Sequence, residues 1–460
     1  MRLWEHISAW LAKNPGKYMR ENDAGMTFEE VAVYAEALGG RLTGEKCCAI
    51  DCKSELAAAV ALLSCFSAGV TAAPLAHRYG EKLCNRVLSL VDPTCVITDA
   101  DGSLRVVRRE KSAYREPDVR PALIMCTSGT TGKPKGVMLS ETNLLTNVND
   151  ICGYFRIGDE DSVLISRPLY HAAVITGEFL PAIRQGCDIR FYPGEYNPVN
   201  LLRLIEQYRI TTFCSTPTLW DLLCLAARLG GKRPLLRKLV ISGETLCGRV
   251  AKRVRNTFPR ADIYHVYGLT EASPRVSYLP PDEFDGNYTS VGRPLDSVRC
   301  KVVDEYGREL PPGRDGMLLV SGPNVMQGYF GDPALTARVL RDGWLYTGDT
   351  AAMEANGYIT IKGRRDEMIN RAGMNIYPQE IESLLMSDRR TREAYVYQLR
   401  DSGLGVRLGL MIAGNFKSTD SVRNLCRKVL SPYQMPNEIR IVDEIPKNGF
   451  GKILRGGEHD

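Results

Sequence analysis

Short apolar runs alternate with helical patterns through much of the chain, and many of these runs end in Gly, Ser or Thr. Runs of this length between helical stretches predict the strands of a doubly wound α/β sheet. Ligands bind beyond the carboxyl ends of such strands, so we expect the functional residues there. The runs are CCAI (47–50), TCVITDA (94–100), DSVLIS (161–166), TTFCSTP (211–217), KLVISGE (238–244) and DIYHVYG (262–268).

The pattern changes after residue 290, where short alternating strands with glycine turns predict a small β-barrel-like unit. After KGRRD (362–366), a helix at 378–387 and strands at 394–400 and 408–412 predict a compact α+β unit. A chain of 460 residues also exceeds the size of one hydrophobic core. We therefore predict a large N-terminal domain over residues 1–363 and a small C-terminal domain over residues 364–460.

One uncharged segment, LAAAVALLSCFSAGVTAAPLA (56–76), has the length of a membrane span. Gly69 and Pro74 interrupt it, and its second part has the pattern of a strand. A buried helix followed by a strand is therefore favoured, and no membrane span is expected.

Charge and cysteine content narrow the range of partners. The net charge of +5 comes from 59 basic and 54 acidic residues, a balance that does not indicate nucleic acid binding. Fourteen cysteines are scattered among apolar neighbours without paired metal-ligand spacing. Free, buried thiols and a cytoplasmic location fit this pattern better than disulfides or a zinc site.

The segment TSGTTGKPKGV (127–137) combines glycines, hydroxyl residues and lysines, which suits a polyphosphate ligand. It does not match a Walker A loop, because Gly129 and Gly132 are three apart and Pro134 follows Lys133. A flexible polar turn is the alternative interpretation.

Three further segments suit a nucleotide ligand. YGLTE (267–271) offers an aromatic face for a purine, a hydroxyl for phosphate and a carboxylate for a metal ion. YTGD (346–349) offers an acid that can accept hydrogen bonds from a ribose diol, and GFGKILR (449–455) places a lysine on a glycine-flanked turn.

Together these motifs resemble the adenylate-forming superfamily, which includes acyl- and aryl-CoA synthetases, nonribosomal peptide synthetase adenylation domains and firefly-type luciferases. The resemblance covers nearly the whole chain and implies an AMP-forming acid–thiol ligase that uses ATP, Mg²⁺ and CoA. The motifs stand in the family order: TSGTTGKPKGV, PLYH, ISGETL, YGLTE, VGRPL, GYF, YTGD, GRRD, NIYPQEIE and GFGKILR.

The resemblance assigns a role to each matching residue. Lys452 bridges the nonbridging oxygens in the transition state, Glu271 binds Mg²⁺, and Asp366 is the hinge of the mobile domain. Thr127, Ser128, Gly129, Thr130, Thr131, Gly132 and Lys135 hold the β- and γ-phosphates; Thr270 contacts the α-phosphate; Gly243, Glu244, Thr245, Tyr267 and Gly268 form the adenine site, with Tyr267 stacked on the base; and Asp349 and Arg364 hold the ribose.

The implied reaction has two steps in one site. A carboxylate attacks the α-phosphorus of ATP, so that positioning and cationic stabilisation supply most of the catalysis. A thiol then attacks the acyl adenylate and AMP leaves. Between the steps the small domain swings, which removes Lys452 and brings residues 372–374 to the site.

The acid is only partly defined. Amino-acid-activating relatives carry an aspartate about three residues after the strand end that matches His171, and residues 172–176 contain none. An acid without an α-amino group is favoured. We expect Glu178 to face a helix surface, but as the one nearby carboxylate it keeps an amine-bearing acid as the alternative. Aryl and acyl acids both remain open, with Trp220 and Tyr170 as ring contacts or core aromatics. The predicted substrate contacts are His171, Thr176, Thr216, Gly243 and Gly268.

The acceptor thiol has two candidates. Because the sequence ends at Asp460, eight residues after Lys452, we expect no fused carrier domain and favour free CoA. The phosphopantetheine of a separate acyl or peptidyl carrier protein is the alternative. A catalytically idle nucleotide-binding relative is a third hypothesis, which the presence of Lys452 and Glu271 disfavours.

Overall fold

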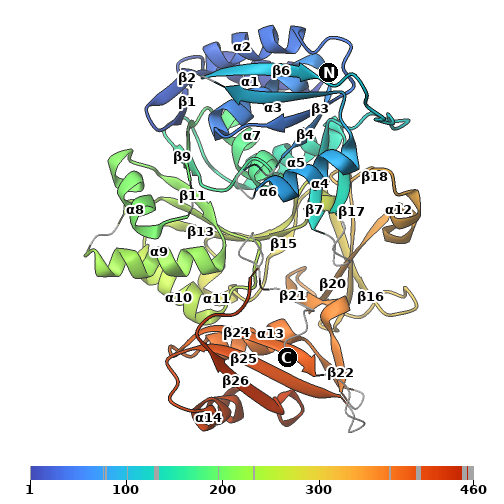
Figure 1. Cartoon of the computed structure of the whole chain (residues 1–460). Helices are drawn as coiled ribbons and strands as arrows, with labels where there is room; N and C mark the ends of the chain where they lie inside the picture. Colours follow the sequence, from blue (N-terminus) through green and yellow to red (C-terminus); the bar gives the residue numbers. More distant parts are fainter. Residues whose placement is uncertain are drawn as a thin grey trace.

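A computed structural model gives the fold of the chain (Figure 1). It describes residues 2–75, 77, 80–100, 102–128, 134–194, 196–231, 234–371, 374–399, 406–447 and 453. A large N-terminal part of mixed α/β structure lies above a smaller C-terminal part, drawn in orange and red in Figure 1. The predicted fold class is therefore confirmed.

A seven-stranded mixed sheet has the strand order β18-β8-β7-β4-β3-β5-β6. Strands β3, β4, β5 and β7 run parallel, and β6, β8 and β18 are antiparallel to their neighbours. Its strands are β3 (Cys47–Asp51), β4 (Thr71–Pro74), β5 (Cys95–Ala100), β6 (Ser103–Arg108), β7 (Leu123–Ser128), β8 (Pro134–Leu139) and β18 (Gly328–Tyr329); the helices between them are α2 (Phe28–Gly40), α3 (Glu55–Ala68) and α4 (Glu81–Val91).

Alternate residues of this sheet enter two different cores, because successive side chains of a strand point to opposite faces. Cys48 and Ile50 join the core that contains α3, whereas Cys47 and Ala49 join the core that contains α4. Burial on both faces explains the continuous apolar run of β3. The predicted helix and strand over residues 56–76 are confirmed as α3 and β4.

A nine-stranded sheet has the order β15-β14-β13-β12-β11-β9-β10-β1-β2. The strands from β1 to β13 in this order run parallel, and β2, β14 and β15 are antiparallel. The strands are β1 (Tyr18–Glu21), β2 (Ala24–Thr27), β9 (Ser162–Ile165), β10 (Asp188–Phe191), β11 (Thr212–Ser215), β12 (Lys238–Ile241), β13 (Asp262–Gly268), β14 (Arg275–Leu279) and β15 (Arg293–Pro294).

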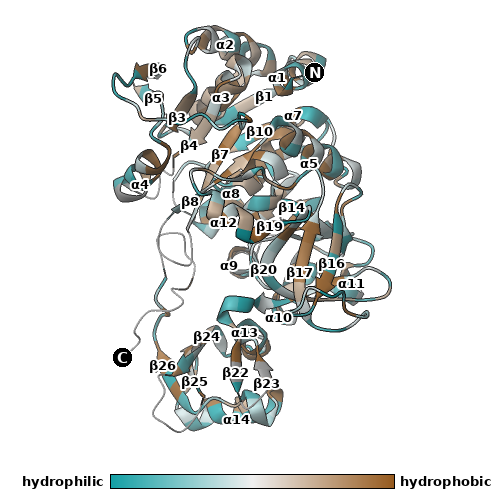
Figure 2. Ribbon diagram, turned by 90° about the vertical axis from the view of Figure 1, so that its right-hand side faces the viewer, coloured by the Kyte–Doolittle hydropathy of each residue, from teal (hydrophilic) through white to brown (hydrophobic). Residues whose placement is uncertain are grey.

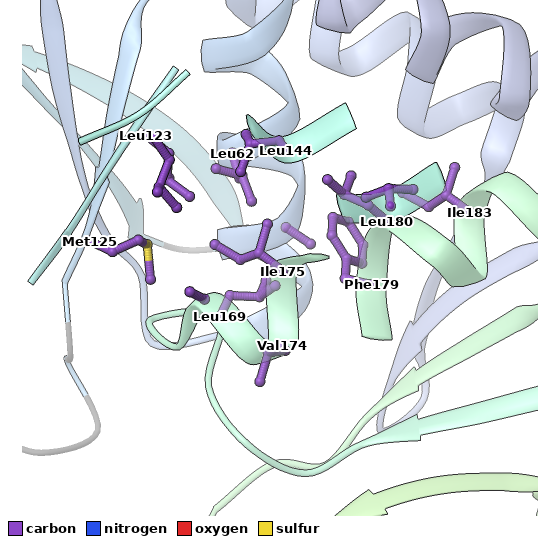
Figure 3. Packing of buried hydrophobic residues seen from close by; sticks show 14 of the residues in the cluster. Leu62, Leu123, Met125, Leu144, Leu169, Val174, Ile175, Phe179, Leu180 and Ile183 are labelled. Carbon is purple, nitrogen blue, oxygen red and sulfur yellow. The ribbon is translucent and has the colours of Figure 1, made fainter. Parts of the chain in front are cut away.

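The largest apolar cluster lies between these two sheets (Figure 3). Met125 enters it from β7 of the seven-stranded sheet, Leu62 from helix α3 and Phe179 from η2. The opposite face of the nine-stranded sheet packs in a second cluster. The helices around the first cluster are α1 (Leu3–Lys13), α5 (Glu141–Tyr154), α6 (Ala172–Val174), the π-helix η2 (Ile175–Phe179) and α7 (Leu180–Gln185); those around the second are α8 (Pro198–Gln207), α9 (Pro217–Leu229), α10 (Gly248–Thr257) and α11 (Phe284–Asn287).

An antiparallel five-stranded sheet follows, as the glycine-punctuated pattern after residue 290 predicts. Its order is β16-β17-β20-β19, with β21 paired to β20. Apolar residues, brown in Figure 2, are concentrated on strands such as β16 and β17. Its elements are β16 (Arg299–Val303), β17 (Gly316–Ser321), α12 (Pro333–Val339), β19 (Leu340–Arg341), β20 (Trp344–Met353) and β21 (Ile359–Arg364).

The C-terminal part contains its own apolar cluster. One short sheet pairs β22 (Ile369–Arg371) with β23 (Met374–Ile376), and a second has the order β24-β25-β26. The domain boundary between residues 363 and 364 stays a prediction. The remaining elements are α13 (Pro378–Met386), β24 (Thr391–Leu399), β25 (Arg407–Gly414), α14 (Thr419–Val429) and β26 (Glu438–Val442), with short 3-10 turns η3 (Thr270–Ala272), η4 (Arg365–Glu367) and η5 (Pro432–Gln434).

Over the part of the chain that the structure describes, none of the helices combines the length and the apolar character that crossing a membrane requires.

The buried histidine of β13 gives a prediction about pH and stability. His265 is 4% exposed and its Nδ1 lies 2.9 Å from the Ser290 carbonyl oxygen. Burial lowers the pKa of His265 to about 4, below the value of about 6.5 for an unfolded chain. Between these values the unfolded chain binds more protons, so stability falls as pH decreases. Between about pH 7.5 and 5, we expect this histidine to remove about 2 kcal/mol of unfolding free energy.

Urea unfolding of the wild-type protein and His265→Gln at both pH values tests this expectation. The glutamine variant has lower stability at neutral pH but a smaller loss on acidification. An equal loss in both proteins would contradict the assignment.

Candidate active site

The two ends of the glycine-rich segment belong to the antiparallel strands β7 and β8, in which Thr127 pairs with Lys135. Both of these residues are partly buried. Gly129, Thr130, Thr131 and Gly132 lie outside the described residues, so their predicted phosphate contacts stay predictions. A strand thus follows this segment, and not the helix that follows a Walker A loop.

Three residues from distant segments meet beside these two strands. Strand β18 pairs with β8 and places the Tyr329 ring 5.6 Å from the Lys135 Nζ. The Tyr329 hydroxyl donates to Glu271 Oε1 at 2.8 Å. Burial raises the pKa of Tyr329, with Glu271 as a further cause, so this hydroxyl stays protonated and donates. Thr270 and Glu271 lie on η3, directly after the carboxyl end of β13.

A second group forms around Asp349, which is 9% exposed. Asp349 and Arg364 are opposite one another on β20 and β21, and Arg364 Nη1 lies 3.3 Å from Asp349 Oδ1. The Tyr267 hydroxyl donates to the other carboxylate oxygen of Asp349. Burial raises the pKa of Asp349, and Arg364 and Tyr267 oppose this effect while Glu271 adds to it. The predicted ribose residues Asp349 and Arg364 therefore share one hydrogen-bonded cluster with Tyr267, one of the predicted adenine residues.

Gly348 allows this arrangement. Its φ of +76° favours glycine, and a Cβ there would lie 2.9 Å from Arg364 Nη2. Arg364 also donates to the Thr347 carbonyl oxygen at 3.1 Å and, through Nε, to Asp366 at 3.2 Å. The predicted hinge residue is thus joined by hydrogen bonds to the predicted ribose residues.

The predicted adenine segment, Gly243 to Thr245, is exposed and follows β12. Glu244 is bound to the start of α9, where Thr218 donates to its Oε2 from the backbone nitrogen at 3.1 Å and from the hydroxyl at 2.6 Å. Thr216 is the N-cap of the same helix. These contacts fix the segment at the ligand-binding edge of the nine-stranded sheet.

Gly268 has a structural requirement of its own. A Cβ there would lie 2.1 Å from the Pro274 carbonyl oxygen, so every other residue is excluded unless the backbone moves. The nitrogen of Leu269 donates to this same oxygen at 2.9 Å. The predicted ligand contacts of Gly268 stay predictions.

Comparison with known proteins agrees with this arrangement. The sequence profile of the AMP-binding enzyme family matches residues 7–330, and that of the AMP-binding enzyme C-terminal domain matches residues 380–452. The chain belongs to the AMP-binding enzyme family.

Two relatives and one solved structure illustrate this membership. The chain is 31% identical to an indoleacetate–CoA ligase of Aromatoleum aromaticum over 348 residues, or 74% of this chain and 68% of the relative. It is 30% identical to a feruloyl-CoA synthase of an Amycolatopsis species over 417 residues, or 86% and 84% of the two chains. The crystal structure of ATP-bound MatB from Rhodopseudomonas palustris has a TM-score of 0.86, 25% identity, and coverage of 98% and 97%.

Two of the residues that are predicted to contact the acid in this AMP-binding enzyme, His171 and Thr176, lie at the start of α6 and on η2. His171 is partly buried at the start of α6, with its ring in edge contact with Tyr170 at 5.5 Å. Thr176 is fully buried, and its hydroxyl donates to the carbonyl oxygens of Ala172 and Ser273. Thr176 thus joins η2 to the backbone at Ser273, and its predicted contact with the acid stays a prediction.

Two aromatic residues that could have flanked the acid are core residues. Trp220 is fully buried and its Nε1 donates to the Val240 carbonyl oxygen at 3.0 Å. Tyr170 is 6% exposed and donates to the Cys126 carbonyl oxygen at 2.7 Å.

Glu178 corrects the expectation of a surface side chain. It is 2% exposed, and its Oε1 lies 2.5 Å from Arg167 Nη2. The sequence around Glu178 does not indicate Arg167 as its partner, because Arg167 follows β9 whereas Glu178 lies on η2. The contact of Tyr329 with the site was also missed. GYF was recognised as a motif, but the pairing of β18 with β8 joins segments that are distant in sequence.

Two predicted elements lie outside the described residues: Lys452, and Ala372 with Gly373 in the segment that precedes Met374. Their roles stay predictions.

Proposed function

We propose that this enzyme joins a carboxylic acid to the thiol of CoA in two steps, at the expense of ATP. An oxygen of the acid forms a bond to the α-phosphorus, and the bond between that phosphorus and pyrophosphate breaks. The CoA sulfur then bonds to the acyl carbon, and AMP leaves. The proposal follows the activities of the two relatives, which are a CoA ligase and a CoA synthase.

The Asp349 cluster is the observation that supports this proposal most strongly. A buried carboxylate at the ends of two strands, oriented by Arg364 and Tyr267, can accept hydrogen bonds from a ribose diol. We assign the triphosphate to the β7–β8 hairpin with Thr127 and Lys135, and the α-phosphate to Thr270. Adenine lies in this assignment between Tyr267 and residues 243–245.

The donor set also suits Mg²⁺. Glu271 offers carboxylate oxygen, the ligand type that Mg²⁺ prefers, close to the hairpin that we assign to the phosphates. When bound, the ion would neutralise part of the phosphate charge. Lys452 would add a cation at the nonbridging oxygens, and Asp366 would be the hinge about which the C-terminal domain moves between the steps.

We also infer a cytoplasmic location. All fourteen cysteines are free, and most are buried. A reducing compartment keeps such thiols unpaired.

Acid-dependent pyrophosphate release tests the function directly. The purified protein is assayed with ATP, Mg²⁺ and panels of aryl, fatty, dicarboxylic and amino acids, with and without CoA. Release that depends on one acid class, with a CoA thioester as product, is the expected result. Release without thioester formation would favour a separate carrier protein as acceptor. The absence of release with every acid would contradict the proposal and favour the idle nucleotide-binding relative.

A further inference from the structure

Two buried charged residues and one partly buried one lie beside the predicted acid site, and the proposed chemistry uses none of them. Arg167 follows β9, Glu178 lies on η2, and Arg275 is the first residue of β14. Because β14 is antiparallel to β13, its first residue lies at the edge where the parallel strands end. Glu178 and Arg275 are 2% and 5% exposed.

The charges of this group do not balance. Arg167 and Glu178 form an ion pair, and Glu178 also attracts Arg275. One carboxylate therefore serves two guanidinium groups, which leaves one positive charge of the group uncompensated. Within the described residues Arg275 forms no ion pair, and its buried Nε and Nη1 have no hydrogen-bond partner. Burying an uncompensated charge is costly unless a ligand compensates for it.

The backbone of Arg275 is held firmly. Asn147 accepts from its nitrogen at 3.2 Å and donates to its carbonyl oxygen at 2.8 Å. Asn324 donates to the same carbonyl oxygen at 3.1 Å. The fold therefore fixes the position of this arginine while part of its guanidinium group stays unused.

The neighbouring helix provides room for the guanidinium group. Gly177 lies on η2, and a Cβ there would be 2.9 Å from Arg275 Nη2, closer than real side chains allow. Val174, Ile175 and Phe179 of the same segment belong to the apolar core (Figure 3). Single π-turns of this kind occur often at functional sites.

The position of Arg275 relates it to the reacting groups. Its Cα pairs with that of Gly268, two residues before Thr270. Gly177 follows directly on the segment from His171 to Thr176 that is predicted to contact the acid. When the reacting carboxylate of the acid lies at Thr270, the other end of the acid therefore lies near Arg275.

We propose that Arg275 binds a second anionic group of the acid, so that the substrates are dicarboxylic acids or acids with an equivalent anion. This inference rests on the proposed function. An anion balances the charge of Arg275, whereas a neutral acceptor supplies hydrogen bonds alone. A substrate ammonium group would add a third cation beside Glu178, which Arg167 already neutralises.

The test compares each dicarboxylic acid with its own monomethyl ester, using short aliphatic and aromatic pairs. The measured quantity is kcat/KM for acid-dependent AMP formation. In the wild-type enzyme we expect the diacid to exceed its half-ester by about tenfold to a hundredfold. Arg275→Met should remove this preference while the KM for ATP stays unchanged, and Arg275→Lys should retain part of it. Arg308→Met, at an exposed hairpin arginine, is the control.

The outcomes separate the two proposals. If the wild-type enzyme uses half-esters or monoacids as well as diacids, or if Arg275→Met leaves the ratio unchanged, the inference is wrong while the ligase function stands. A preference for amine-bearing acids would also overturn it, in favour of Glu178 as the specificity residue. If no acid of any class supports AMP formation, both proposals fail. Retained half-ester activity in Arg275→Met shows that the variant is folded.

Discussion

Replacing Lys452 with alanine is expected to lower the rate of acyl-adenylate formation by about a hundredfold to a thousandfold, because the variant lacks a cation at the oxygens where charge develops. The Kd for ATP should change little, since the phosphate and ribose contacts assigned here do not involve this lysine. Pyrophosphate release in single-turnover experiments measures the first quantity, and calorimetric ATP titration measures the second.

A matched control lies five residues earlier. Lys447 pairs with Glu393 at 2.6 Å within the C-terminal part, and Lys447→Ala should leave adenylation nearly intact. Supplying the acyl adenylate directly gives a second control, because the Lys452→Ala variant should still transfer the acyl group to CoA. Normal pyrophosphate release by Lys452→Ala would show that this lysine is not the catalytic one.

Asp349→Asn is expected to raise the KM for ATP by about a hundredfold. Hydrogen bonds to a charged group contribute about 1.5–3 kcal/mol each, and a carboxylate that accepts two from the ribose supplies enough for this change. The substitution also removes one of the two negative partners of Arg364, the other being Asp366. Steady-state kinetics with ATP as the varied substrate provide the measurement.

Nucleotide analogues make this test specific. Removing both ribose hydroxyls from ATP should raise KM strongly in the wild-type enzyme and only slightly in Asp349→Asn, because the two changes delete the same interaction. Asp304→Asn, at a partly exposed carboxylate in a hairpin turn, serves as the control. Additive effects of the analogue and Asp349→Asn would place the ribose elsewhere.

The sequence predicted those parts of the fold that depend on local pattern. The apolar runs at 47–50, 238–244 and 262–268 correspond to β3, β12 and β13, because their residues are buried on both faces of parallel sheets. The short strands after residue 290 and the helix at 378–387 were also predicted. The family was recognised from motif order alone.

What sequence reasoning missed depends on contacts between distant segments. No local pattern indicates that β18 pairs with β8, yet this pairing delivers Tyr329 to Glu271. Glu178 was placed on a helix surface because the partner that stabilises its burial, Arg167, comes from another element. Arg275 was overlooked for the same reason, since its neighbours Gly177 and Glu178 lie almost a hundred residues earlier.

The position of β1 has a consequence for the way the protein is made. Strand β1 adds to the nine-stranded sheet beside β10, and Tyr18 bonds to Asp188, 170 residues later in the chain. A ribosome adds about 5–20 residues per second, so β10 is synthesised about 10 to 30 s after β1. During that interval β1 has β2 as its partner in the sheet, and its other edge is open to other chains. Protection of this part of the nascent chain by chaperones would therefore matter more than for a strand whose neighbours are all close in sequence.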